Sequence, residues 1–172
     1  LVGSEMCIRD SIHIEPDGVF VTAKPNLKNG TAEIEISANI LNRYFEEKSV
    51  WVEAEIKNSD GHTVSRLDRA VSIKGWDRAG FSDSEIINNV KLWDIDDPNL
   101  YSAKLRLYYN ENVCDEYTLS FGIRDIRFNP DSGFYLNGKN IKIKGLCCHH
   151  DHAGMGIAVT KSVNEYRIQQ MK

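Results

Sequence analysis

The sequence predicts a mainly β protein, an antiparallel sandwich followed by the opening of a β/α unit, and three observations support this. Apolar and polar residues alternate with a period of two between Ile12 and Phe121, and turn-forming residues separate the alternating segments. A helical pattern begins only near Ser162. With 172 residues, of which 41 % are hydrophobic and 27 % charged, the chain has a globular composition and can bury a core.

Residues 1–11 lie outside this pattern, because they show neither strand alternation nor a continuing helical stripe. We interpret them as a non-native extension in preference to a native linker. The alternation that follows is clear in segment 31–38, where four apolar residues face one side as a half-buried strand requires. The other predicted strands are 18–23, 49–57, 63–73, 85–92, 101–109 and 114–121. About seven strands with turns every ~8–12 residues are typical of an immunoglobulin-like β-sandwich, which we assign to residues 12–122.

The alternation of apolar and polar residues ends after this segment. Residues 123–133 end in the run Asn-Pro-Asp-Ser-Gly and predict a linker, and we expect residues 134–172 to start a second domain. Within it, Asn137-Gly138 between apolar runs indicates a β-hairpin, and 141–146 predicts a strand.

A helix is expected at the C-terminal end of the chain. Ser162 and Glu165 form a capping-box pattern that predicts a helix from about Val163, and no stop signal precedes Lys172. Hairpin, strand and helix are the order in which a (β/α)₈ barrel opens. Such a barrel needs ~250 residues, so we expect only its beginning here.

The charge balance excludes several classes of partner. Lys and Arg number 21 and Asp and Glu 25, giving a net charge of −4, so no basic surface for nucleic acid or an anionic membrane is expected. No apolar run approaches the ~20 residues that span a bilayer, and no signal peptide is visible. The chain is expected to be soluble. Its compartment stays open, and a periplasmic or secreted location is compatible with the sequence.

One short segment concentrates reactive side chains. Three of the five histidines and two of the four cysteines fall between Cys147 and His152. In an extended chain Cys147, His149 and Asp151 share one side, and the intervening residues share the other. Zinc sites normally have a second ligand pair elsewhere, which this sequence lacks, so we predict no metal site. Two alternatives remain for this segment: a binding site at the C-terminal end of a barrel strand, or ordinary packing of loop residues. We favour the binding site for His149 and ordinary packing for each of the other residues.

The three tryptophans are a weaker signal. Trp51, Trp76 and Trp93 are candidates for sugar stacking, but large aromatic residues in a sandwich more often pack in the core or between domains. The acidic segment around Asp96 lacks the ligand spacing of an EF-hand and reads as a turn.

Three stretches, the last of them in two parts, together resemble glycoside hydrolase family 2, which contains β-galactosidases, β-glucuronidases and β-mannosidases. Segment 92–101 (LWDIDDPNLY) resembles the end of that family's immunoglobulin-like domain, and 121–124 (FGIR) resembles the strand that leaves it. Segments 134–139 (FYLNGK) and 144–151 (KGLCCHHD) resemble the start of its catalytic barrel. The order of these segments and the spacing between them match the family as well. Cys147 stands where the form best known from β-galactosidases has Asn.

The resemblance implies a retaining glycosidase, β-galactosidase-like, with two catalytic glutamates on later barrel strands beyond Lys172. Only the first histidine of the barrel motif carries over, which makes His149 the expected substrate-binding residue and leaves no catalytic residue in this segment. We expect a carbohydrate substrate and no cofactor here, although a divalent cation such as Mg²⁺ is compatible with the complete enzyme.

The resemblance also implies that other domains of the complete enzyme contact this segment. An N-terminal sugar-binding domain and the rest of the barrel would pack against this segment, and an oligomer is compatible. The alternative interpretation is a stand-alone carbohydrate-binding or adhesion module.

Overall fold

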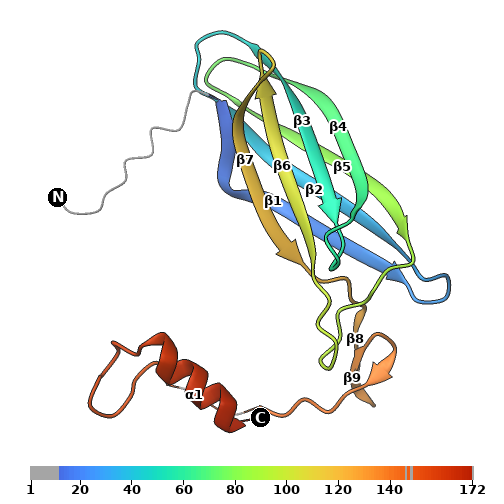
Figure 1. The fold of residues 1–172 in the computed structure, drawn as a ribbon, viewed down its shortest axis with the longest axis vertical. Coiled ribbons are helices and arrows are strands. Elements are labelled where there is room, and N and C mark those ends of the chain that lie inside the picture. The colour runs from blue at the N-terminus through green and yellow to red at the C-terminus, as the bar shows by residue number, and fades with distance from the viewer. Residues whose placement is uncertain (1–11, 146, 148, 172) are drawn as a thin grey trace. The chain divides into compact units, whose positions relative to one another are not determined.

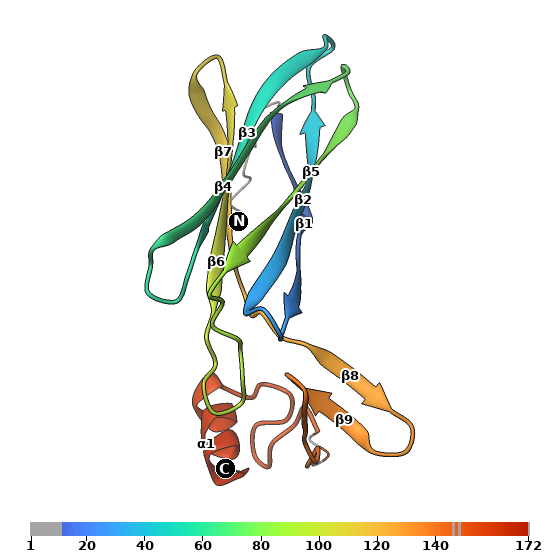
Figure 2. The same cartoon turned by 90° about the vertical axis from the view of Figure 1, so that its right-hand side faces the viewer.

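The computed structural model describes residues 12–145, 147 and 149–171, and the expected extension 1–11 lies outside them. Two antiparallel sheets dominate the fold (Figures 1 and 2). A three-stranded sheet has the order β1-β2-β5 and a four-stranded sheet the order β4-β3-β6-β7. Their bounds are β1 Ile12–Asn26, β2 Thr31–Asn42, β3 Lys48–Lys57, β4 Thr63–Ile73, β5 Arg78–Asn88, β6 Tyr101–Tyr109 and β7 Asn112–Phe121. The protein is therefore mainly β, as predicted.

The period-two pattern places one face of every strand in a single core. On β2 the four alternate apolar residues of segment 31–38 are all buried, and Val52 on β3 and Leu105 on β6 are fully inaccessible. These side chains from both sheets form one hydrophobic cluster. Because the side chains between them point outward, the outer faces of both sheets are polar or mixed.

The fifth strand differs most from its prediction. β5 begins at Arg78, whereas the pattern predicted a strand over 85–92. Its first half has few apolar residues, and only Phe81 and Ile87 are buried along the whole strand. Backbone pairing with the full length of β2 therefore extends this strand where hydrophobic patterning could not reveal it. The strand ends at Asn88, and Asn89 adopts a left-handed conformation with φ 52°.

A small third sheet follows the two large ones. Strands β8 (Ile126–Asn129), β9 (Gly133–Leu136) and β10 (Lys139–Asn140) are antiparallel in the order β10-β9-β8. Asn137 and Gly138 have φ 51° and 78° and form the two-residue turn between β9 and β10, which confirms the predicted hairpin.

Contacts divide the chain into two compact units, with the division between Ile141 and Lys142. The small sheet belongs by its contacts to the first unit, whereas the sequence analysis assigned β8 to the linker 123–133 and almost all of β9 and β10 to the segment 134–172. The predicted strand 141–146 is not formed over the described residues 141–145. A parallel barrel strand needs neighbours on both sides for its hydrogen bonds, and over the described residues 141–145 only the Ile141 N–H bonds to a strand, donating to the Phe134 carbonyl at 2.9 Å. The second unit contains α1 (Lys161–Met171).

Helix α1 begins two residues before the predicted start. Lys161 is its first residue, Asn164 N donates to Thr160 O at 3.3 Å, and the Lys161 ammonium lies 3.6 Å from the Glu165 carboxylate. Ser162 therefore lies in the first turn, and the predicted N-cap position was wrong. Among the described residues, no helix has the length and apolar character needed to cross a membrane.

Candidate functional site

The predicted histidine segment borders a hollow of about 440 Å³ in the second unit. Cys147, His149 and Asp151 lie on one side of it, and α1 supplies the other wall. The wall residues from the helix are Tyr166, Arg167, Gln170 and Met171. A short extended segment and one helix thus bring together an imidazole, a carboxylate, a phenol and an amide.

The alternation predicted from the sequence agrees with this arrangement. Cys147, His149 and Asp151, the set expected to share a side, all line the hollow, whereas His150 and His152 do not. Cys148 lies outside the described residues. The segment keeps the alternation of an extended chain even though no strand is assigned to it.

Arg167 connects the two sides of the hollow, and sequence reasoning did not identify it. Its guanidinium donates to the His149 carbonyl at 3.5 Å and to the Asp151 carbonyl at 2.5 Å. The planar guanidinium presents several N–H groups at fixed angles, which suits two carbonyl oxygens in one segment. The separations of 18 and 16 residues leave no local pattern that could have revealed these contacts.

His152 has a different environment from His149. Its backbone N–H donates to the Gly156 carbonyl at 3.0 Å, and its Nδ1 lies 2.9 Å from the Ala153 carbonyl. Gly154 and Gly156 have positive φ values of 82° and 58°, which close this tight loop. The His152 ring therefore contacts the backbone of its own loop, whereas the exposed His149 side chain borders the hollow.

The chemistry available in the hollow is binding rather than bond cleavage. Asp151 is the one carboxylate among the described lining residues, and retaining glycosidases need two, roughly 5 Å apart. Among residues 12–145, 147 and 149–171, no three His, Cys, Asp or Glu side chains come together to hold a metal ion. The lining residues do offer hydrogen-bonding groups beside a tyrosine ring.

Three of the family-like segments meet in the first unit, around the Asn137 side chain. Its amide donates to the Trp93 carbonyl at 3.0 Å, and its oxygen accepts from Asp125 N at 3.1 Å. The Arg124 guanidinium lies over the Trp93 ring, 4.9 Å from its centroid. A side chain at Gly122 would come within 2.9 Å of the Trp93 side chain, so only glycine fits there. Segments 92–101, 121–124 and 134–139 thus form one junction.

Comparisons with known proteins agree with this picture. The profile of glycosyl hydrolases family 2 matches residues 12–124. The chain is 29 % identical over 161 residues to a β-galactosidase from Bacteroides ovatus, covering 94 % of this chain and 19 % of that protein. It is 42 % identical over 88 residues to a β-galactosidase from Thermoanaerobacterium thermosulfurigenes, covering 51 % of this chain and 12 % of that protein.

Solved structures show the same relationship. A glycosyl hydrolase family 2 member from Bacteroides cellulosilyticus matches with a TM-score of 0.83 and 33 % identity, over 92 % of this chain and 22 % of that one. A β-glucuronidase from Bacteroides uniformis matches with a TM-score of 0.84 and 25 % identity, over 94 % of this chain and 20 % of that one. The chain thus spans between 12 % and 22 % of the length of these relatives. The family profile covers well over half of the chain, and the chain belongs to glycosyl hydrolases family 2.

Proposed function

We propose that this chain is part of a retaining β-glycosidase, β-galactosidase-like in its substrate. In this proposal residues 12–122 form an immunoglobulin-like sandwich, and residues 134–172 form the first hairpin, strand and helix of a (β/α)₈ barrel. The observation that carries the proposal is the placement of His149 at a hollow whose two sides are joined by the Arg167 hydrogen bonds.

His149 is the proposed substrate-binding residue. At the end of a first barrel strand its imidazole would donate a hydrogen bond to a hydroxyl of the sugar whose bond is broken. The Arg167 contacts hold the backbone at His149 and Asp151, so the chain that carries the ring is held before the substrate arrives. The catalytic carboxylates come from other parts of the complete enzyme, and so do the surfaces that cover residues 142–145.

A stand-alone carbohydrate-binding or adhesion module is the second candidate. It accounts for two packed sheets but not for the junction that attaches the β8–β10 sheet to them, nor for the hollow in residues 142–171. The named relatives are β-galactosidases and β-glucuronidases, which favours the enzyme.

The test is His149→Ala in the complete enzyme, with a nitrophenyl β-galactoside and a nitrophenyl β-glucuronide as substrates. A hydrogen bond that strengthens at the transition state is worth roughly 2–4 kcal/mol, so kcat/KM should fall roughly 30- to 1000-fold, with much of the loss in kcat. His152→Ala is the matched control and should cost far less, because that ring bonds within its own loop.

Two further measurements separate the alternatives. If the segment held a metal, Cys147 and His150 replacements would be as damaging as His149→Ala, and zinc would restore activity lost to a chelator. The purified 172-residue chain should show no turnover of either substrate, because a carboxylate pair is lacking among its described lining residues. A His149→Ala enzyme with unchanged kcat/KM would reject the assignment of His149.

A further inference from the structure

Trp51 lies on the outer face of the four-stranded sheet with its ring accessible. Its side chain is 47 % exposed, and its neighbours across the ladders are Tyr108 on β6 and Ala70 on β4. Alanine is too short to cover an indole, so a hollow of about 430 Å³ opens beside the ring. Tyr108, Asn110 and Glu111 complete its wall.

The three tryptophans differ in what covers their rings. The Trp93 ring lies beneath Arg124 in the junction. The Trp76 ring has Phe45 packed against it, 5.6 Å between centroids, and the Arg43 guanidinium 5.8 Å from its centroid. Within the described residues, no aromatic or cationic side chain lies over Trp51. The Trp51 ring differs from the Trp76 ring in this respect, although the Trp76 side chain is the more exposed of the two at 55 %.

The surroundings of this hollow are held in place. Trp51 is on β3, which has hydrogen-bonded neighbours on both sides, so its backbone is fixed. Asn110 and Glu111 form the tight turn between β6 and β7, both left-handed with φ 49° and 66°. Two successive positive φ angles are the geometry of a two-residue hairpin turn, which fixes the backbone that carries both side chains. The turn places an amide and a carboxylate beside the aromatic pair.

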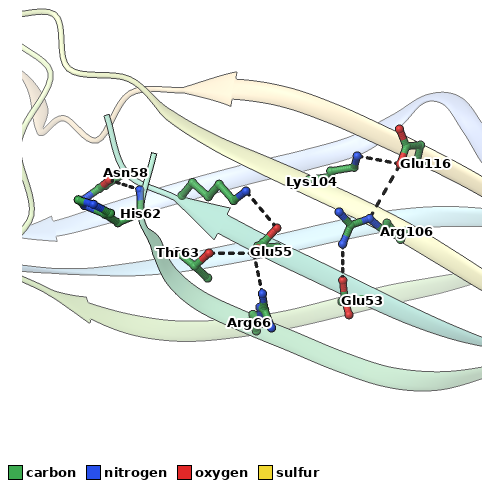
Figure 3. Close-up of polar contacts among 10 residues, drawn as sticks. Glu53, Glu55, Asn58, His62, Thr63, Arg66, Lys104, Arg106 and Glu116 are labelled. Carbon is green, nitrogen blue, oxygen red and sulfur yellow. Dashed lines mark hydrogen bonds and ion pairs between the residues drawn. The ribbon is translucent and has the colours of Figure 1, made fainter. Parts of the chain in front are cut away.

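The rest of this outer face is a network of paired charges (Figure 3). Arg106 contacts Glu53 at 2.7 Å and Glu116 at 3.9 Å, and Lys104 contacts Glu116 at 2.8 Å. Covering these groups with a protein surface would remove water from charges that are already satisfied, which is costly. Beside these charges the face carries a row of apolar side chains, Trp51, Tyr108 and Val113, the last 50 % exposed and paired with Tyr108.

We infer that this hollow binds a pyranose unit of a glycan. A pyranose ring has an apolar face of C–H groups, which can lie on the exposed indole, and a rim of hydroxyls. Tyr108 OH and the Asn110 amide can donate to those hydroxyls, and the Glu111 carboxylate can accept from them. The hollow also falls in the size range of small-ligand sites, roughly 300–1,000 Å³. This inference goes beyond the proposed function, because it involves no bond cleavage and does not depend on His149.

The test is binding of tetrasaccharides to the 172-residue chain, measured by calorimetry and by tryptophan fluorescence. The probes are β-1,4-linked galactose, xylose and mannose tetramers and the α-1,4-linked glucose tetramer. At least one should bind, Trp51→Ala should weaken it at least tenfold, and Tyr108→Phe should weaken it about threefold. Phe20→Ala is the control, since Phe20 is 61 % exposed on the other sheet, and it should leave the affinity unchanged.

Because Trp51 is exposed, its removal should leave the melting temperature nearly unchanged, so loss of binding is separable from loss of folding. The inference is overturned if none of the four probes binds, or if Trp51→Ala binds like the parent chain. It is equally overturned if Trp51 instead mediates protein association, seen as a sedimentation change abolished by Trp51→Ala. The two tests are independent. Failure of the His149→Ala test would not affect the glycan-binding result, and failure of the glycan-binding test would not affect the assignment of His149.

Discussion

Residues 12–141 and residues 142–171 differ in how they obtain their structure. The first region closes a core from two sheets, in which side chains such as Ile36 and Leu105 are fully inaccessible to solvent. The second has a helix and one glycine-closed loop but, among its described residues, no buried side chain. Since burial of apolar surface is the main stabilising contribution, the first region supplies the stability, whereas the second carries the candidate chemistry.

The largest expected effect is a difference in local stability between the two regions. Amide hydrogens of β3 and β6 should exchange only through global unfolding, at about 5–15 kcal/mol. Amides of residues 142–160 should exchange several kcal/mol more readily. Hydrogen exchange followed by mass spectrometry tests this. Equal protection from exchange in the two regions would show that they do not differ in local stability.

A pair of truncations tests the same contrast through packing. Leu105→Ala should lower the free energy of unfolding by about 3–4 kcal/mol, because the site is fully buried on β6 between β3 and β7. Ile168→Ala on α1, where the side chain is 55 % exposed, should change it by less than about 0.5 kcal/mol. Urea denaturation measures both. Similar losses would mean that α1 shares the core's stability.

Asn137→Gly tests where the boundary between the two regions lies. Glycine keeps the left-handed backbone but removes the amide that binds Trp93 and Asp125, so we expect a loss of about 1–3 kcal/mol. Asn110→Gly is the control, because Asn110 is also left-handed but is exposed in its turn. A loss no larger than that of the control would show that the small sheet is not stabilised through this junction.

The smallest effect concerns a buried carboxylate of the first region. The Thr63 hydroxyl, 2.8 Å from Glu55, and the Arg66 guanidinium, 3.0 Å away, lower the pKa of Glu55 to about 2. Because the folded pKa lies below the ordinary value of 4.5, this stabilisation is present above pH 4.5 and is lost as the pH falls toward 2.

Glu55→Gln should therefore cost about 1–2 kcal/mol at neutral pH and flatten the decline in stability between pH 4.5 and 2. Chemical denaturation at several pH values measures this, with the exposed Glu33→Gln as the matched control. An unchanged pH profile in Glu55→Gln would show that the contacts in Figure 3 do not stabilise the sheet.

The two regions also differ in how much the sequence could reveal. Most large-sheet strands carry their own signal, because half-burial imposes alternation on the chain. The exception is β5, which was misplaced because Arg78–Ser84 has almost no alternation. The Asn137-Gly138 turn was predictable because few residues tolerate two successive positive φ angles.

The site was less predictable. His149 was identified through a family motif, and the shared side of Cys147, His149 and Asp151 through extended-chain geometry. Arg167 was missed because its partners are backbone carbonyls, which carry no side-chain signature. The hollow at Trp51 depends on Ala70, whose small size matters only after two strands pair in one register.

The Asn137 junction has a kinetic consequence. Its bond to Trp93 closes a loop of 44 residues, whereas its bond to Asp125 spans only 12. Long loops cost more entropy to close, so the β9–β10 turn can form early but its docking must wait until β6 and β7 have brought Trp93 and Ile123 together. During synthesis Trp93 leaves the ribosome before Asn137, so the surface that receives the turn can already be in place when the turn emerges.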